Sequence, residues 1–100
     1  EPRERLQSYY VEGCLAVAVN YFGRGQSADA MSWARRVVET APWIEQAYQL
    51  LMRAYARQGQ RSLALATFRQ AKAALDAELA VAPSPLTIWL AERLQRGEDI

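Results

Sequence analysis

The chain aligns with itself when it is shifted by 34 residues, and this internal repeat constrains its fold more than any other feature. The aligned pairs are Cys14 with Tyr48, Val17 with Leu51, Tyr21 with Tyr55, Gly25-Gln26 with Gly59-Gln60, Ala30 with Ala64, Ala34 with Phe68, and Val37 with Ala71. A repeat of this length is one supersecondary unit, and it buries its apolar face only by stacking on a neighbour. The sequence therefore predicts two stacked units of similar structure.

The period and the residue types resemble the tetratricopeptide repeat, a helix-turn-helix unit. Ala30 and Ala64 are small enough to let two antiparallel helices approach closely. Gly25 and Gly59 stand where the first helix of each unit should end, because glycine adopts the left-handed conformation there without strain. We therefore expect each unit to be a helical hairpin with a glycine in its turn.

Helix-breaking and capping residues divide the chain into five predicted helices. They cover residues 3–22, 27–41, 44–57, 61–79 and 85–96. Ser27 and Ser62 are the predicted N-caps of the second helix in each unit. Pro42 closes the first unit, because proline cannot continue a helix. No segment alternates between apolar and polar residues with a period of two, so we expect no strand.

The stretch Pro83-Ser84-Pro85 is predicted to end the fourth helix and to begin the fifth, with Ser84 as N-cap and Pro85 in the first turn. Apolar residues then recur at three- and four-residue spacing, at Leu86, Trp89, Leu90 and Leu94. This stripe is predicted to lie on the second unit and to cover its apolar end. The predicted fold is thus a single all-α domain over residues 1–100, an α-α superhelix of two tetratricopeptide-like helical hairpins and a C-terminal capping helix.

Three segments carry a more specific resemblance. They are EPRERL at 1–6, YQLLMRAYARQGQRSLAL at 48–65 and ELAVAPSPLT at 78–87. In this order they resemble the bacterial transcriptional activator domain of SARP-type (antibiotic regulatory protein) activators. Ala80 and Leu86 depart from that family's pattern, which has glycine and an acidic residue at these positions. If Ala80 is left-handed, it costs about 1 kcal/mol relative to glycine.

The resemblance implies a domain of a bacterial transcriptional regulator. In that family the domain usually follows a winged-helix DNA-binding domain, and it supports dimerisation and contacts with partner proteins. We therefore expect residues 1–100 to be a fragment of a longer protein, since the chain also begins without methionine. The expected partners are another protein or a second copy in a homodimer, with DNA bound only through a domain outside this chain.

Composition and side-chain chemistry argue against other classes of function. Twelve Lys and Arg residues against 11 Asp and Glu residues give a net charge of +1, which provides no global attraction to nucleic acid or to an anionic membrane. The chain has no histidine, and its one cysteine, Cys14, lies on an apolar helix face and is predicted to be structural. A single cysteine forms no internal disulfide, which favours a reducing, cytoplasmic location. We expect no enzyme activity, no catalytic, cofactor-binding or metal-binding residue, no membrane contact and no small-molecule substrate.

Two helix faces and one tryptophan are the candidate contact surfaces. The third helix carries a polar, basic stripe, and the first helix carries a mostly apolar face. Trp33 is included because large aromatic side chains are enriched at the centres of interfaces. The predicted protein-interaction residues are Glu12, Leu15, Val19 and Phe22 on the first helix, Trp33 on the second, and Gln46, Gln49, Arg53 and Arg57 on the third.

The sequence leaves alternatives open for both faces. The basic stripe is either a docking surface for an acidic or extended peptide or a solvated helix face. The apolar face is covered by a preceding domain or a second copy, or else it holds an apolar ligand segment. We expect a non-catalytic protein-interaction and dimerisation module of a bacterial transcriptional regulator. The alternative is a general tetratricopeptide peptide-binding adaptor in a signalling or ATPase protein.

Overall fold

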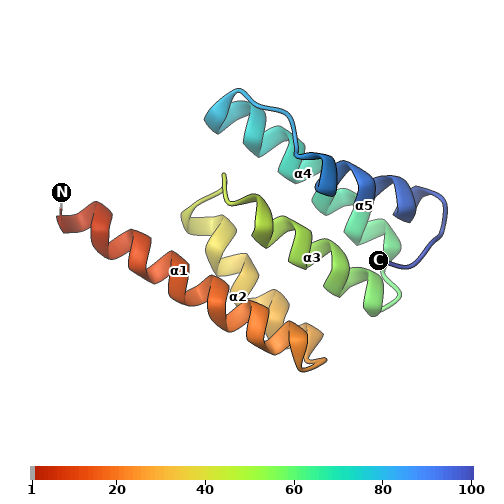
Figure 1. Ribbon diagram of the computed structural model, residues 1–100, viewed down its shortest axis with the longest axis horizontal. Coiled ribbons are helices and arrows are strands. Elements are labelled where there is room, and N and C mark those ends of the chain that lie inside the picture. Colours follow the sequence, from red (N-terminus) through yellow and green to blue (C-terminus); the bar gives the residue numbers. More distant parts are fainter. Residues whose placement is uncertain (1) are drawn as a thin grey trace.

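The computed structural model describes residues 2–100, with side-chain environments from Arg5 onward, and these residues form five helices and no strand (Figure 1). The helices are α1 (Pro2–Gly23), α2 (Ser27–Thr40), α3 (Glu45–Arg57), α4 (Arg61–Leu79) and α5 (Pro85–Gln95). The predicted all-α fold is confirmed, and each predicted helix boundary lies within one residue of the observed boundary. Within residues 2–100, no helix is both long enough and apolar enough to span a membrane.

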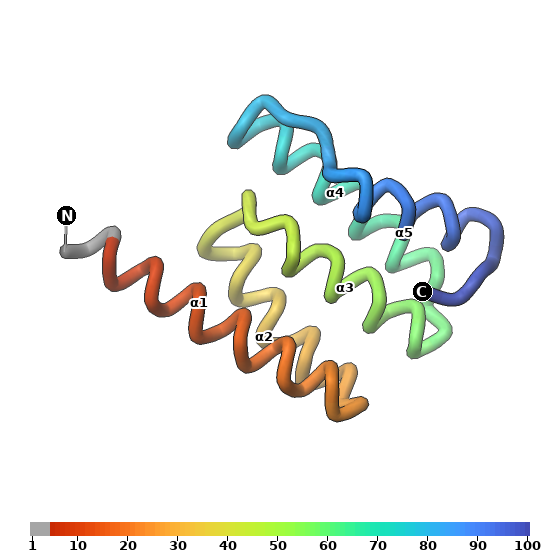
Figure 2. The backbone as a smooth tube through the Cα atoms, in the orientation of Figure 1, coloured from red at the N-terminus to blue at the C-terminus, as the bar shows by residue number. Residues whose placement is uncertain are grey.

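The five helices are arranged as two helical hairpins followed by a fifth helix. α1 packs mainly on α2, and α3 on α4, while contacts between α2 and α3 join the two hairpins. α5 contacts both α3 and α4, and so covers one side of the second hairpin. In the view of Figures 1 and 2, α1, α3 and α5 form the nearer layer, and the N-terminal part of α1 extends beyond α2.

The two hairpins contain the same turn, 34 residues apart. In each turn a glycine has a positive φ, 78° at Gly25 and 74° at Gly59. The next residue donates its backbone N–H back to the preceding helix, as Gln60 does to the carbonyl oxygen of Tyr55 at 2.9 Å. This bond satisfies a carbonyl group that would otherwise lack a partner at the helix end. The predicted glycine turns are therefore confirmed.

The prediction that Ser27 and Ser62 cap the second helices is wrong. The N-cap residues are Gln26 and Gln60, and neither makes a side-chain capping hydrogen bond. Only three residues separate the two helices of each hairpin. The glutamine that closes the first helix therefore also begins the second, and the serine already lies inside that helix.

Small side chains bring the helices of the core together. Ala30 and Ala64 are fully buried, as their predicted role in close helix packing requires. The cluster between the hairpins consists of Ala18, Ala30, Met31, Ala34, Leu50, Leu51 and Ala54. Larger side chains such as Tyr21 and Tyr55 pack at its edge. A second cluster contains Cys14, which is buried as predicted.

The predicted start of α5 is confirmed, but α4 ends at Leu79, so its end is set at Ala80 and not by Pro83. Ala80 ends α4 in the left-handed conformation, with φ 54° and ψ 40°. Ser84 caps α5 by accepting a hydrogen bond from the backbone N–H of Thr87, and Pro85 is the first helical residue. Gly97, with φ 75°, follows the end of α5.

The predicted apolar stripe of α5 is only half correct. Leu90 and Leu94 are buried against the second hairpin, but Leu86 and Trp89 are 44% and 48% exposed. The buried face consists instead of Thr87, Leu90, Ala91 and Leu94. Thr87 is held in this face by two residues of α3, since its hydroxyl group donates to the Glu45 carboxylate and accepts from the Gln49 side chain. These bonds orient the whole helix.

Candidate protein-interaction site

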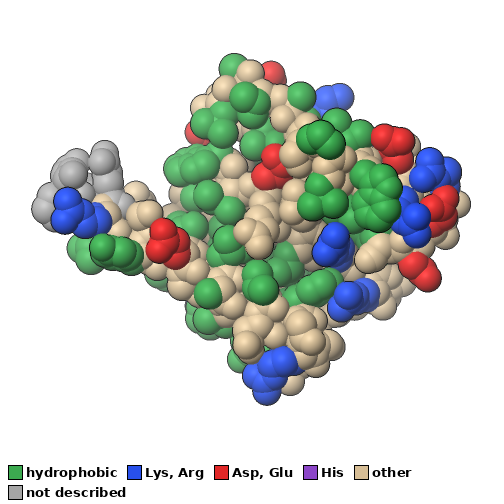
Figure 3. All heavy atoms as spheres, viewed as in Figure 1, with side chains coloured by type: hydrophobic (Ala, Val, Ile, Leu, Met, Phe, Trp, Pro, Cys, Tyr) green, Lys and Arg blue, Asp and Glu red, His purple; other side chains and the backbone are tan. Residues whose placement is uncertain are grey.

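A groove runs along the layer formed by α1, α3 and α5. Its volume is about 430 Å³, and its lining residues are Val19, Phe22, Glu45, Gln46, Gln49, Leu50, Arg53 and Leu86. Figure 3 shows this face of the molecule, where hydrophobic side chains lie close to Lys and Arg side chains over α3 and α5. Five of the nine predicted interaction residues line this one groove, although the sequence placed them on two separate helix faces.

The walls of the groove are apolar and open to solvent. Val19 on α1 and Leu86 on α5 are each 44% exposed. Leu50 on α3 is buried beneath them, and Phe22 is half-buried against the core between the hairpins. A partner that covers Val19 and Leu86 removes apolar surface from water, and this burial favours association.

Arg53 of α3 lines the groove, and a second arginine, Arg57, lies beside it on the same helix. Arg53 is half-buried, and its Nε atom is buried without a hydrogen-bond partner among the residues that the structure describes. Arg57, one turn later, is exposed, and its guanidinium carbon lies 3.9 Å from the ring centroid of Phe22 on α1. The contact of Arg57 with Phe22 links α3 to α1, while the charge of Arg53 is available inside the groove.

The acidic residue of the groove, Glu45, is held by α5. Its Oε2 atom accepts hydrogen bonds from the backbone N–H of Ser84 at 2.7 Å and from the hydroxyl group of Thr87. Gln49 donates its side-chain N–H to the same Thr87 oxygen at 2.9 Å. Burial alone raises the pKa of Glu45, but the hydrogen bonds from Thr87 and Ser84 outweigh it, and the pKa lies below its ordinary value. The Glu45 carboxylate therefore orients α5 and does not pair with Arg53.

Four predicted residues do not line the groove: Arg57, described above, and three that lie away from it. Glu12 is exposed on α1, and Leu15 is half-buried against the cluster that contains Cys14. Trp33 lies on α2, where it packs against two core clusters and stacks with Arg36, whose guanidinium carbon is 4.2 Å from the ring centroid. Their role in protein contacts stays a prediction, and the structure does not bring Trp33 to the groove.

The family of the chain follows from a comparison with protein-family models. The model described as the bacterial transcriptional activator domain matches residues 1–95. The chain belongs to this family. The match ends where α5 ends, so it covers both hairpins and the fifth helix. The comparison with curated proteins gave no match, and neither did the comparison with solved structures.

Sequence reasoning missed three groove residues of this bacterial transcriptional activator domain: Glu45, Leu50 and Leu86. Leu86 was assigned to the buried stripe of α5, yet it forms a groove wall. One signal was available, since Leu86 replaces the acidic residue that the family pattern has after the hinge. An apolar residue on an exposed first turn indicates a contact other than helix capping.

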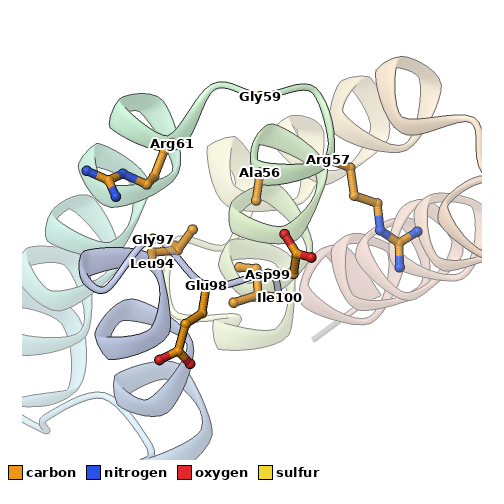
Figure 4. Close-up of a pocket in the computed structure, with 9 residues that line it drawn as sticks. All are labelled: Ala56, Arg57, Gly59, Arg61, Leu94, Gly97, Glu98, Asp99 and Ile100. Carbon is orange, nitrogen blue, oxygen red and sulfur yellow. The ribbon is translucent and has the colours of Figure 1, made fainter.

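A second hollow, of about 370 Å³, lies where the C-terminal residues of the activator domain fold back over the turn between α3 and α4 (Figure 4). Ile100 packs on the cluster that contains Leu90 and Leu94, and Arg93 pairs with Glu98 at 3.0 Å. In Figure 4 the side chains of Arg57, Arg61 and Glu98 point in different directions. The hollow thus lacks the convergent polar groups that a small-molecule site needs. Among the side chains that the structure describes, no group of three His, Cys, Asp or Glu could hold a metal ion.

Proposed function

We propose that this activator domain is a non-catalytic protein-interaction module of a cytoplasmic bacterial transcriptional regulator, acting beside a DNA-binding domain outside this chain. The observation that carries the proposal is the groove between α1, α3 and α5, with its open apolar walls and its arginine. Such a surface suits a segment of another protein, because apolar burial supplies affinity and placed polar groups supply specificity. Contact through the groove would place or regulate the attached DNA-binding domain.

The two hairpins are proposed to be tetratricopeptide repeats. The glycine turns recur after 34 residues, and buried alanines occupy equivalent positions at Ala30 and Ala64. A stack of such units presents the first helix of each hairpin on one side. α1 and α3 are these first helices, and they form two sides of the groove.

A second copy of the chain is the other occupant that the groove face could take. A homodimer was expected to use Leu15, Val19 and Phe22, but Leu15 and Phe22 pack against their own core. Their replacement would therefore disturb the fold as well as an interface. Val19 and Leu86 are the residues whose replacement tests association without loss of core packing.

The general peptide-binding adaptor is the alternative function. It is favoured by the basic residues Arg53 and Arg57 along α3. It would use the same groove in a signalling or ATPase protein. The family match over residues 1–95 supports the regulator instead.

The test uses the regulator that carries this domain, with Val19→Asp and Leu86→Asp combined. We expect activation of its target promoter to fall about tenfold or more, as for loss of an interface hot spot, while the regulator still binds its DNA site. The matched control is Leu63→Asp, because Leu63 is 46% exposed on α4 and lies outside the groove. Sedimentation of the isolated chain shows whether the groove variant also abolishes a dimer. Full activation by the groove variant, or an equal loss in the control, would refute the proposal.

A further inference from the structure

We infer that the groove binds a protein segment in which a carboxylate side chain lies next to an aliphatic one, with the carboxylate held by the guanidinium group of Arg53. This inference rests on the proposed function and adds the chemistry of the partner. It follows from three observations: the position of Arg53 in the groove with no hydrogen-bond partner for its Nε atom among the described residues, the hydrogen bonds of Glu45 to α5, and the apolar walls on either side of α3.

The first observation concerns the hydrogen bonding of Arg53. A buried hydrogen-bond donor without a partner is unfavourable, and most such groups in native proteins have one. The Nε atom of Arg53 has none within the described part of the chain, although the side chain lines an open groove. Because the Nε atom itself is buried, a partner in the groove meets the terminal N–H groups of the half-buried Arg53 side chain. A carboxylate matches a guanidinium best, because it can accept two parallel N–H hydrogen bonds.

Among the residues that the structure describes, none supplies such a carboxylate to Arg53. Glu45, the acidic residue that lines the groove, accepts its hydrogen bonds from Ser84 and Thr87 at the start of α5. Arg57 adds a second positive charge next to Arg53 on the same helix and stacks on Phe22. The groove is therefore electrostatically complementary to an acidic segment, and not to a basic one.

The apolar walls of the groove determine which partner side chain lies next to the carboxylate. Val19 and Leu86 are open apolar side chains on α1 and α5, and Leu50 forms the floor between them. An aliphatic side chain that enters here contacts all three elements of the layer. The volume of about 430 Å³ is enough for a few side chains, so a short segment of a partner fills it.

The experiment is a selection of short random peptides, displayed on phage, on four forms of the immobilised chain. These are the natural chain, Arg53→Gln, the double variant Val19→Asp with Leu86→Asp, and Arg69→Gln as a charge-matched control. Arg69 is exposed on α4 and outside the groove, so Arg69→Gln removes the same charge from another surface. The readout is the frequency of Asp and Glu beside Leu, Ile and Val in the enriched peptides.

We expect the natural chain and Arg69→Gln to enrich acidic residues next to aliphatic ones. Arg53→Gln should lose the acidic preference and keep the aliphatic one, and the double variant should lose both. One selected peptide should then bind Arg53→Gln about tenfold or more weakly, as for the loss of a charge-assisted pair. Enriched peptides without an acidic preference that still need Val19 and Leu86 would overturn the carboxylate inference and leave the proposed groove intact. Enrichment that ignores every groove substitution, or no enrichment at all, would count against both.

A second variant separates a binding role of Arg53 from a structural one. Arg53→Met keeps the unbranched stem as far as the position of the Nε atom, and it removes the guanidinium group with its unpaired donor. We expect its thermal midpoint to stay unchanged or to rise by a few degrees, while binding of the selected peptide is lost. A clear fall of the midpoint would show that Arg53 supports the fold of the free domain, and would overturn the inference.

Discussion

Ala80 holds a backbone conformation that residues with a side chain rarely adopt, with φ 54° and ψ 40° at the end of α4. The backbone N–H of Ala80 closes the helix by donating to Asp76 at 3.0 Å. Glycine is the usual residue at this position, because it lacks the Cβ atom that crowds the left-handed region. From the sequence, a cost of about 1 kcal/mol relative to glycine was expected if Ala80 is left-handed. The structure shows that Ala80 is left-handed.

Replacing this one residue tests the cost at the residue scale. We expect Ala80→Gly to raise the free energy of unfolding by about 1 kcal/mol, since the folded chain loses a strained side chain. Urea denaturation followed by circular dichroism measures the change. Ala82→Gly is the control, because Ala82 lies in the same hinge without a positive φ. If Ala80→Gly raises the free energy of unfolding no more than Ala82→Gly does, the left-handed conformation of Ala80 does not cost the domain stability.

At the scale of elements, α5 is oriented by polar contacts at its first turn. Glu45 and Gln49 of α3 reach Thr87, which is fully buried, and Glu45 also binds the backbone of Ser84. Buried polar groups of this kind favour a single orientation, because rotation of the helix would leave them without partners. The same contacts expose Leu86 to the groove.

Substitution of Glu45 tests this orientation through pH. The pKa of Glu45 is lowered in the folded domain, so its carboxylate stabilises the fold above the ordinary carboxyl pKa. That contribution is lost as pH falls through the lowered folded value. We expect the natural chain to lose stability between about pH 5 and pH 3, and Glu45→Gln to lose less there. At neutral pH, Glu45→Gln should be destabilised by about 1 kcal/mol, since neutral hydrogen bonds are weaker than charge-assisted ones.

Thermal unfolding across this pH range is the measurement. Glu92→Gln, an exposed carboxylate on α5, removes the same charge and should keep the natural pH profile. If the profiles of the natural chain and Glu45→Gln coincide, then Glu45 does not hold α5 through its charge.

At the scale of the whole molecule, we expect the helices to unfold together, because their core clusters share elements. Met52 of α3, Ala64 of α4 and Leu90 of α5 belong to one cluster, while α3 also packs on the first hairpin. We expect Leu90→Ala to lower the free energy of unfolding by about 2–5 kcal/mol, since Leu90 is fully buried. Leu79→Ala, at an exposed position on α4, should change it by less than about 0.5 kcal/mol.

Two optical probes decide whether this loss is global. Tryptophan fluorescence reports the surroundings of Trp33, Trp43 and Trp89, whereas far-ultraviolet circular dichroism reports all five helices. Coincident urea transitions in Leu90→Ala are expected for one cooperative unit. A fluorescence transition that does not coincide with the dichroism transition would show that the domain does not unfold as one unit.

The sequence by itself determined the helices and the family. Helix ends depend on local residues, and Gly25, Gly59 and the stretch 83–85 mark them without reference to the rest of the fold. The serine caps were wrong because each turn is too short for a separate capping residue. The family resemblance of residues 1–6, 48–65 and 78–87 agrees with the match over residues 1–95.

Only the tertiary structure decided how the helices are rotated about their axes. The apolar periodicity of α5 allowed Leu86 and Trp89 to be buried, but the bond from Thr87 to Glu45, 42 residues away, selected the neighbouring face. Because this face of α5 is buried, Leu86 lines the same groove as Val19. The predicted faces of α1 and α3 therefore belong to one groove. The physical reason is that helix boundaries depend on neighbours in the chain, whereas helix rotation depends on contacts between residues distant in sequence.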